Sequence, residues 1–399
     1  MHRDRTDIAG KTRWRELALL FLRLGTTAFG GPAAHVSMME DEVVRRRGWL
    51  TREKFLDLLG ATNLIPGPNS TEMAIHIGFL RGGWAGLVVA GVSFIIPAMV
   101  IVMGFAWAYV RFQKLPEVTW LLYGVKPVII AIVLQALWGL GRTAIKTKFL
   151  GVLAILATAL NFLGIDELAI LLGAGILAGW GQGLGADRKG NRRALLLMTV
   201  PVGGFLAVIY FVMRIPTSAR MQFGLVPLFL FFCKVGSILF GSGYVLLAFL
   251  QADLVQNWHW LTTTQLLNAI AVGQVTPGPV FTTATFIGYL LAGFPGALIA
   301  TAGIFLPAFF FVAISGPLVP RSRKSIIAGA FLDGVVVASL SLMAVVTWRL
   351  GREAVIDPVT VLLSIASAIL LIRFRLNSLW LVLGGAIIGL LVNITGILN

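Results

Sequence analysis

The stretch VTPGPVFTTATFIGYLLAGFPGALIATAGIFLPAFFFVAISGPLVP at residues 275–320 contains no charged side chain. Extended upstream to residue 254, it forms an uncharged run of 67 residues. A helix that crosses a bilayer needs roughly 20 mostly apolar residues, so the run is long enough for more than one crossing. Of all 399 residues, 58% are hydrophobic and 12% are charged, about half the charged share of a typical soluble domain. The sequence therefore predicts an all-α polytopic membrane protein and excludes a soluble one.

The charge balance is strongly basic, with 32 Lys and Arg against 17 Asp and Glu and a net charge of +15. In a soluble chain this excess would indicate nucleic acid, but in a polytopic protein it is typical of cytoplasmic loops that face anionic lipid. We therefore expect the lipid bilayer, and no nucleic acid, as the partner of these cations. The single cysteine, Cys233, excludes an internal disulfide, and we expect no metal site and no cofactor. The polar start MHRDRTDIAGKTRWRE lacks the apolar core of a signal peptide.

The uncharged run belongs to an internal duplication. The sequence LIPGP at 64–68 recurs as VTPGP at 275–279, and RLGTTAFGG at 23–31 recurs as KVGSILFGS at 234–242, in both cases 211 residues later. Beyond the PGP motif the offset becomes 210, which relates Gly78 to Gly288. A register held this long indicates two homologous halves.

The duplication predicts four parts of the chain. A polar N-terminus covers 1–12, a first repeat covers 13–182, and a second repeat covers 224–399. Residues 183–223 join the repeats through a charged linker and one unpaired transmembrane helix at 194–213.

Within each half, the PGP motif interrupts the apolar pattern. Proline lacks a backbone donor and clashes with the preceding turn, so we expect broken or re-entrant helices there. Short apolar pieces flank the first motif at 53–65 and 70–80, and four longer segments, each taken to cross the membrane, follow at 84–110, 119–141, 149–164 and 168–182.

Basic residues predict the orientation of the halves. The loop at 45–54 carries five cations, whereas its repeat at 256–265 carries none. With the N-terminus in the cytoplasm, the positive-inside rule is best satisfied when the second repeat is inverted relative to the first. Parallel repeats are the alternative and give a weaker charge bias.

Arg23 and Lys234 are cations at matched positions within apolar segments. Charges inside a membrane mark substrate pathways or ion pairs. We expect the two cations to face each other and to bind an anion. The alternatives are snorkelling to the interface or pairing with an acid such as Glu72.

The motifs Pro66-Gly67-Pro68 and Pro277-Gly278-Pro279 form the second part of the expected site. Helix N-termini at mid-membrane present N–H groups and a positive dipole end to anions, and transporters with internal repeats use this arrangement. Polar residues around both motifs are suited to donate to an oxyanion: Asn63, Asn69, Ser70, Thr71, Gln274, Thr282 and Thr283. The alternatives are a capping box of Asn69 and Glu72, a helix start at Pro68, and packing hydrogen bonds for Asn63 and Gln274.

Glu72 and His76 are titratable groups just after the first motif, whereas their counterparts Thr283 and Ile287 are not. This asymmetry favours proton coupling through Glu72. A structural salt bridge between Glu72 and Arg23 is the alternative.

Other matched positions predict structural or gating roles. Glycines would break the chain after the first apolar helix of each half: Gly30, Gly31 and Gly241. Glu42 maps to Asp253, where we expect an interfacial cap or a gate contact. Lys126 and Asp333 lie in matched helices, either as a charge-compensating pair between the halves or as substrate contacts.

Enzyme signatures are absent from the sequence, which contains no HExxH motif, nucleophile elbow or Walker A loop. We therefore expect a protein that is not an enzyme.

Three blocks of the sequence resemble the chromate ion transporter family: FGGPAAHVSMMEDEVVRRRGWL from Phe29, LLGATNLIPGPNSTEMAIHIG from Leu58, and AIAVGQVTPGPVFTTATFIGYLLAG from Ala269. The resemblance covers nearly the whole chain and looks like the long form of that family, in which two domains are fused. It implies a carrier in the bacterial inner membrane that exports chromate, a tetrahedral dianion similar to sulfate, with the proton-motive force.

The residues themselves favour a secondary transporter of a small oxyanion that works by alternating access, with protons as the coupling ion. Chromate export is the preferred reading. Transport of sulfate or another oxyanion, including uptake, is the nearest alternative, and an anion channel or a membrane-embedded enzyme is more distant. The pattern is also compatible with a homodimer.

Overall fold

A computed structural model describes residues 3–28, 31–62, 65–113, 115–186, 221–239, 246–315, 326–374 and 376–395. Within these ranges the chain forms helices and their connections, without a strand. The expected all-α fold is confirmed. The predicted unpaired helix at 194–213 lies outside the described residues.

The helices occur in the same order in both halves. The first half contains α1 (Arg3–Thr27), α2 (Gly31–Glu40), the π-helical turn η1 (Asp41–Arg46), α3 (Arg52–Thr62), α4 (Asn69–Phe112), α5 (Pro116–Ala144), α6 (Lys148–Phe162) and α7 (Glu167–Ala186). The second contains α9 (Leu225–Ile238), α10 (Leu246–Phe249), the π-helical turn η4 (Leu250–Asn257), α11 (Thr263–Val275), the 3-10 turn η5 (Val280–Thr282), α12 (Thr283–Ser315), α14 (Ile326–Ala354), α15 (Pro358–Phe374) and α16 (Ser378–Thr395). The limits of the repeats at 182 and 224 stay predictions.

Helices α4 and α12 each consist of a short arm and a long arm that fold back on each other. The turns fall at Gly83 and Gly293, where φ is +61° and +62°, a left-handed conformation that glycine adopts at little cost. Beside the first turn, the backbones of Gly78 and Gly86 touch, so a methyl group on either would collide with the carbonyl oxygen of the other. The short arm follows the PGP motif, and the long arm is available to span a membrane.

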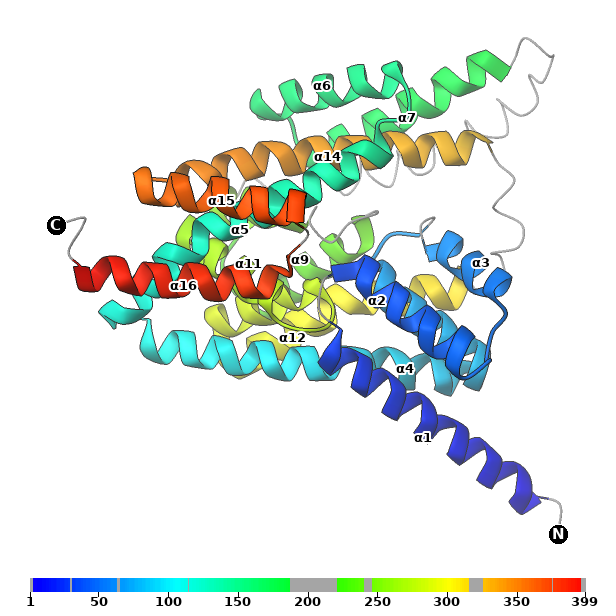
Figure 1. Cartoon of the computed structure of the whole chain (residues 1–399). Coiled ribbons are helices and arrows are strands. Elements are labelled where there is room, and N and C mark those ends of the chain that lie inside the picture. The colour runs from blue at the N-terminus through cyan, green and yellow to red at the C-terminus, as the bar shows by residue number, and fades with distance from the viewer. Residues whose placement is uncertain are drawn as a thin grey trace.

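The two halves interlock through their C-terminal helices. Helices α6 and α7 pack on α14 of the second half, and α15 and α16 pack on α5 of the first half. Figure 1 shows α6, α7 and α14 stacked together at the top of the molecule. Gly124 of α5 and Gly385 of α16 bring their backbones into contact, a close approach that small residues allow between membrane helices.

Helices α5 and α14 pack against each other and run in opposite directions. Gly141 lies beside Leu340, whereas Gly351 lies beside Ile130. Residue numbers therefore rise along one helix as they fall along the other. Since α5 and α14 are counterparts in the repeat, each half contributes its copy of this helix in the opposite sense.

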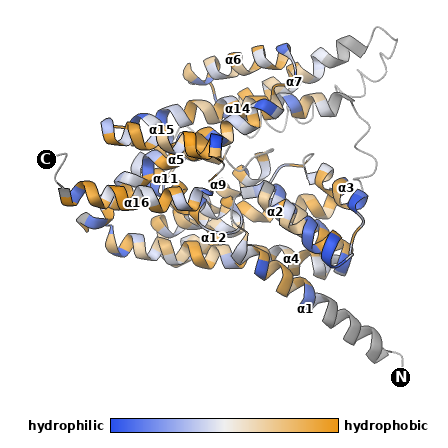
Figure 2. Ribbon diagram, in the orientation of Figure 1, coloured by the Kyte–Doolittle hydropathy of each residue, from blue (hydrophilic) through white to orange (hydrophobic). Residues whose placement is uncertain are grey.

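Four helical segments are long and apolar enough to cross a membrane: Asn69–Phe112, Glu117–Ala144, Val280–Ile314 and Gly329–Ala354. The other apolar helices are shorter, so fewer full crossings are evident among the described residues than the four per half that the sequence suggests. Figure 2 shows hydrophobic residues along most helices and hydrophilic ones gathered near the end of α2 and at α3. Large apolar side chains such as Ile155, Leu163 and Trp380 are mostly exposed, as a lipid-facing surface requires.

Candidate functional site

Each PGP loop is hydrogen-bonded to the opposite half of the chain. The Gly67 N–H donates to the Leu239 carbonyl oxygen at 2.6 Å, at the end of α9. The Gly278 N–H donates to the Ala28 carbonyl oxygen at 2.9 Å, just after α1. Donors and acceptors are both related by the offset of 211 residues, so the same contact is made twice. The helix is broken at both motifs, as expected.

The loops also touch the long arm of the opposite half. A methyl group on Gly278 would lie 2.7 Å from the Ala98 side chain in α4, and one on Gly67 would lie 3.6 Å from the Ala308 side chain in α12. The region around the loops is therefore built by both halves. In this conformation the N–H groups of the two glycines are engaged by carbonyl oxygens and are not available to an anion.

His35 of α2 reinforces the contact at Ala28. Its Nε2 lies 3.0 Å from the Ala28 carbonyl oxygen, and because a carbonyl only accepts, this nitrogen carries the proton. The imidazole packs edge-on against Phe94 of α4. Sequence reasoning missed this residue, since its counterpart Leu246 leaves no matched polar pair to find.

The polar residues after the first PGP motif are buried with few partners. Ser70, Thr71, Glu72 and His76 are all buried. Among the described residues, the Thr71 hydroxyl, both carboxylate oxygens of Glu72 and Nε2 of His76 have no hydrogen-bond partner. Glu72 and His76 lie one turn apart and share a face of α4. Buried polar groups are normally hydrogen-bonded, so this cluster of unpartnered groups departs from the usual pattern.

Glu72 lies directly against the first PGP loop. The Glu72 carboxylate occupies the space that a Cβ at Gly67 would need, and Gly67 has a φ of +141°, which L side chains rarely adopt. The alternative reading of Asn69 and Glu72 as a capping box is wrong, because Pro68 is the N-cap of α4 and no side chain caps it. The helix begins one residue after Pro68, and Glu72 points back at the loop instead of at its own N-cap.

The second PGP motif offers fewer unengaged donors than the first. The Thr282 hydroxyl donates to the Pro279 carbonyl oxygen at 2.7 Å, and the Thr283 hydroxyl donates to the Val280 carbonyl oxygen at 2.8 Å. Gln274 is partly buried near the end of α11 and has a contact of its own. The two loops are therefore alike in backbone but different in how many of their side-chain hydroxyl groups are engaged.

Arg23 and Lys234 each form an ion pair within their own half. Arg23 of α1 pairs with Glu42 of η1, and Lys234 of α9 pairs with Asp253 of η4 at 3.2 Å. The cations are counterparts, and so are the acids. The alternative pairing of Arg23 with Glu72 is wrong, since Glu42 takes that place. A gating role for these acids stays a prediction.

A π-helical turn positions each of the two acids. The Arg47 N–H donates to the carbonyl oxygen of Glu42, five residues back, and the Trp258 N–H donates to that of Asp253 in the same way. Such turns are rare and frequently occur at functional sites. The wider turn brings each carboxylate to the first helix of its half.

The two acids differ in how much positive charge surrounds them. Glu42 also contacts Arg46 at 3.1 Å and Arg47 at 3.3 Å. Asp253 accepts one further hydrogen bond, from Asn257 at 3.2 Å. The ion pair of the first half therefore lies in a more basic environment than that of the second half.

Asp333 links the halves through Lys146 and not through Lys126. Nζ of Lys146 lies 2.7 Å from Oδ1 of Asp333. At the related place the Tyr123 hydroxyl donates to Oδ2 of Asp357 at 2.7 Å. The pairing of Lys126 with Asp333, one of the two alternatives for these residues, is wrong, because Asp333 pairs with Lys146 and Lys126 lies nearly one turn beyond Tyr123, the true counterpart of Asp333.

Three of the predicted residues, Gly30, Asn63 and Gly241, lie outside the described residues. Gly31 starts α2 with φ at +77°, so the chain does break after α1.

Comparisons with known proteins cover nearly the same residues as the two repeats. The sequence model of the family described as "Chromate transporter" matches residues 15–180 and 226–390. The chain is 32% identical over 380 residues to the chromate transport protein of Cupriavidus metallidurans, covering 94% of this chain and 92% of the relative. It is 30% identical over 390 residues to the chromate transport protein of Pseudomonas aeruginosa, covering 94% and 92%. It is 29% identical over 357 residues to the probable chromate transport protein of Synechococcus elongatus, covering 89% of each. No solved structure matches the chain.

The fold and these matches define a multi-pass membrane protein that transports ions. More specifically, the chain belongs to the chromate transporter family. Since this is a family of transporters, the expectation that the protein is not an enzyme is confirmed.

Proposed function

We propose that this protein exports chromate across the bacterial inner membrane by alternating access, as a secondary transporter driven by the proton-motive force. The observation that carries the proposal is the reciprocal hydrogen bonding of the two PGP loops, Gly67 to Leu239 and Gly278 to Ala28. A site built at the boundary of two repeats opens to either side when one repeat rocks against the other. Breaking one of the two contacts while the other holds would provide such a motion.

In this proposal the oxyanion binds at the start of α4, between the PGP loops. The hydroxyl groups of Ser70 and Thr71 and the N-terminal end of the helix supply hydrogen bonds and positive potential. Arg23 and Lys234 are held by acids in the present conformation. Opening either ion pair would release its cation to the path of the anion. Arg23 and Lys234 would then serve both as gates and as groups that attract the anion.

Glu72 is the proposed proton carrier, with His76 one turn further along α4. Its carboxylate is fully buried and has no hydrogen-bond partner among the described residues. Burying an unpaired charge is costly, so this group would exchange a proton when the site changes its access to water. The second half has Thr283 and Ile287 at the matched positions, so it offers no titratable group there.

The membrane potential favours export of a dianion. Moving one elementary charge through 100 mV is worth about 2.3 kcal/mol, so a dianion that leaves a negative cytoplasm gains about 4.6 kcal/mol by the same relation. A proton that enters in exchange adds to this driving force. Uptake of the same anion would have to work against it.

The proposal includes inverted repeats and a cytoplasmic N-terminus. The opposite directions of α5 and α14 support inversion, as does the excess of cations in the loop at 45–54 over that at 256–265. In this arrangement the Arg23–Glu42 and Lys234–Asp253 pairs lie toward opposite sides of the membrane, where they would open in turn.

Flux measurements on the full chain in proteoliposomes test the proposal. We expect transport of labelled chromate. The flux should accelerate when a proton gradient is imposed that drives protons in the direction opposite to the movement of chromate. Glu72→Gln is expected to reduce the response to the pH gradient tenfold or more while chromate exchange without a gradient persists. Glu53→Gln, which neutralises an exposed acid of α3, is the matched control and should behave as the unmodified protein does.

Three results would contradict different parts of the proposal. Transport of sulfate without transport of chromate would overturn the substrate. Flux in the unmodified protein that ignores the pH gradient would favour a channel. Full coupling in Glu72→Gln would remove this carboxylate from the proton route.

A further inference from the structure

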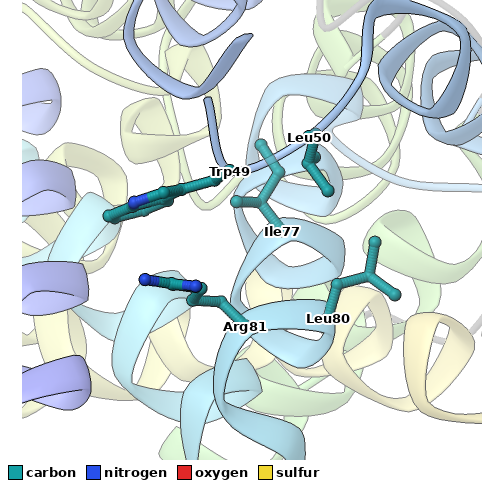
Figure 3. Close-up of a pocket in the computed structure, with 5 residues that line it drawn as sticks. All are labelled: Trp49, Leu50, Ile77, Leu80 and Arg81. Carbon is teal, nitrogen blue, oxygen red and sulfur yellow. The ribbon is translucent and has the colours of Figure 1, made fainter. Parts of the chain in front are cut away.

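A pocket of about 140 Å³ lies beside the short arm of α4. Its lining consists of Trp49 and Leu50, which follow η1, and Ile77, Leu80 and Arg81 of the short arm (Figure 3). Three of these side chains are aliphatic, and the other two present an indole and a guanidinium group. None of them has a part in the transport mechanism proposed above.

Two guanidinium groups stack on the indole of Trp49. Cζ of Arg81 lies 5.0 Å from the ring centre, and Cζ of Arg47 lies 5.1 Å from it. Figure 3 shows the Arg81 side chain extended along the ring. Stacking of this kind holds a cation in place without using its hydrogen-bond donors. Nε of Arg81 is buried and has no hydrogen-bond partner among the described residues, so a positioned cation with an unused donor lines the pocket.

Across the described part of the chain, no acid forms an ion pair with Arg81. Arg47 shares the Glu42 carboxylate with Arg23 and Arg46, and Arg46 also contacts Asp41 at 2.7 Å, so two acids already serve these three cations. The pocket therefore has an excess of positive charge, which favours an anion as its occupant.

The second half shows that the fold does not require cations at this place. The counterparts of Arg47, Trp49 and Arg81 are Trp258, Trp260 and Leu291. The two indoles pack with their ring centres 4.7 Å apart, and Trp258 is buried. In the second repeat, aromatic and aliphatic side chains thus occupy the region around Trp260. In the first repeat, two guanidinium groups occupy the corresponding region around Trp49. Packing alone does not account for the arginines.

Lipid-facing side chains flank the pocket. Leu80 is 45% exposed, and Trp84, just past the glycine turn, is 64% exposed. Tryptophan at the end of a membrane segment is typical of the boundary between lipid and water. A ligand at this position would meet a guanidinium group on one side and aliphatic side chains on the other, so it needs an anionic group joined to an apolar body.

We propose that this pocket binds the phosphate of an anionic phospholipid. The Arg81 guanidinium would donate to the phosphate oxygens while Trp49 fixes its orientation, Arg47 would add positive charge, and the glycerol and acyl parts of the lipid would rest on Leu80. Basic pockets between membrane helices bind such headgroups on the cytoplasmic side. Free phosphate and the transported oxyanion share the charge of this ligand but lack its apolar body.

Native mass spectrometry of the purified full chain tests the proposal with phosphatidylglycerol and phosphatidylcholine of equal chain length. Arg81→Leu, which installs the residue of the second repeat, is expected to weaken phosphatidylglycerol binding about five- to tenfold and to leave phosphatidylcholine binding unchanged. Arg111→Leu removes an exposed arginine from the far end of α4 and is the matched control, with unchanged binding of both lipids.

Equal affinity of Arg81→Leu and the unmodified protein for phosphatidylglycerol, or equal affinity of the unmodified protein for both lipids, would overturn the proposal. Inorganic phosphate or chromate could instead displace phosphatidylglycerol, with a displacement that is lost in Arg81→Leu. That result would overturn the lipid assignment and indicate that the pocket binds a soluble oxyanion. Arg81→Lys guards against a misfolded variant, because it keeps the charge. It should bind phosphatidylglycerol more tightly than Arg81→Leu, and equal weakening in both would also contradict recognition by charge.

Discussion

Glu42 and Asp253 occupy matched positions but depend on their cations to different degrees. Glu42 contacts Arg23, Arg46 and Arg47, so the loss of one arginine leaves two. The partners of Asp253 are Lys234 and the neutral side chain of Asn257. Both acids are buried, and a buried acid that loses its cation carries the cost of an unpaired charge. The same substitution should therefore have unequal effects in the two halves.

Lys234→Gln is expected to lower the free energy of unfolding by roughly 1–3 kcal/mol, since it leaves Asp253 without a cation. Arg23→Gln should lower the free energy of unfolding by less than about 1 kcal/mol, because Arg23 is exposed and is one of three arginines that contact Glu42. Thermal unfolding of the two purified variants provides the measurement. Adding Asp253→Asn to Lys234→Gln should recover part of the loss, and equal losses in both single variants would be inconsistent with the described pairing.

Matched offsets were sufficient to single out Arg23, Lys234, Glu42 and Asp253, but not to pair them. The pairing depends on the π-helical turns, which widen the helix by one residue per turn and redirect the acid. No residue type marks such a turn, so the sequence offered Glu72, and not Glu42, as the alternative partner of Arg23. His35 was missed for a related reason, because its partner is a backbone carbonyl that sequence does not reveal.

Among the structural elements, the breaks at the proline motifs could be predicted from the sequence, whereas the fold-back at the glycine turns could not. A break at PGP follows from the chemistry of proline, and the structure has it at both motifs. The fold-back within α4 contains no proline, and its first turn residue, Gly82, is replaced by Ala292 in the second half. The sequence separated 70–80 from 84–110 but gave no sign that these arms pack on each other.

Gly86→Ala should disrupt this packing, because the added methyl group would meet the Gly78 carbonyl oxygen. Overpacking of this kind costs about 1–3 kcal/mol, and we expect a lower unfolding midpoint and less folded protein after extraction into detergent. Gly104→Ala, in the long arm of the same helix, has open space around its new methyl group. It should be neutral or stabilising by up to about 1 kcal/mol, and similar behaviour of both variants would contradict the hairpin.

For the whole molecule, hydropathy and the repeat predicted an all-α membrane protein in two halves, but not how the halves join. The joining contacts are made by glycine faces, such as Gly124 against Gly385, and by Lys146 with Asp333 and Tyr123 with Asp357. Each contact joins residues about 190 to 260 positions apart, and the sequence of neither segment indicates which other segment it contacts. Hydrophobic periodicity and charge do not predict contacts between segments this far apart in the sequence.

Inversion of the repeats predicts that matched residues lie on opposite sides of the membrane. Glu53 and Thr264 are exposed counterparts near the starts of α3 and α11. With Cys233 replaced by serine, we expect a membrane-impermeant maleimide to label Thr264→Cys in intact cells and Glu53→Cys only after permeabilisation. Labelling of both from the same side would refute inversion and favour parallel repeats.

The exchange of C-terminal helices between the halves sets an order on biosynthesis. Helix α5 enters the membrane more than 200 residues before α15 and α16, its partners in the finished fold, are translated. Its glycine face at Gly124 is covered in the finished fold by Gly385 and Gly389 of α16, so that face stays open until the last helix is made. The first half therefore completes its packing only when the last helix is made, and a chain that stops short of Ser378 has α14 and α15 beside α5 but leaves the face at Gly124 uncovered.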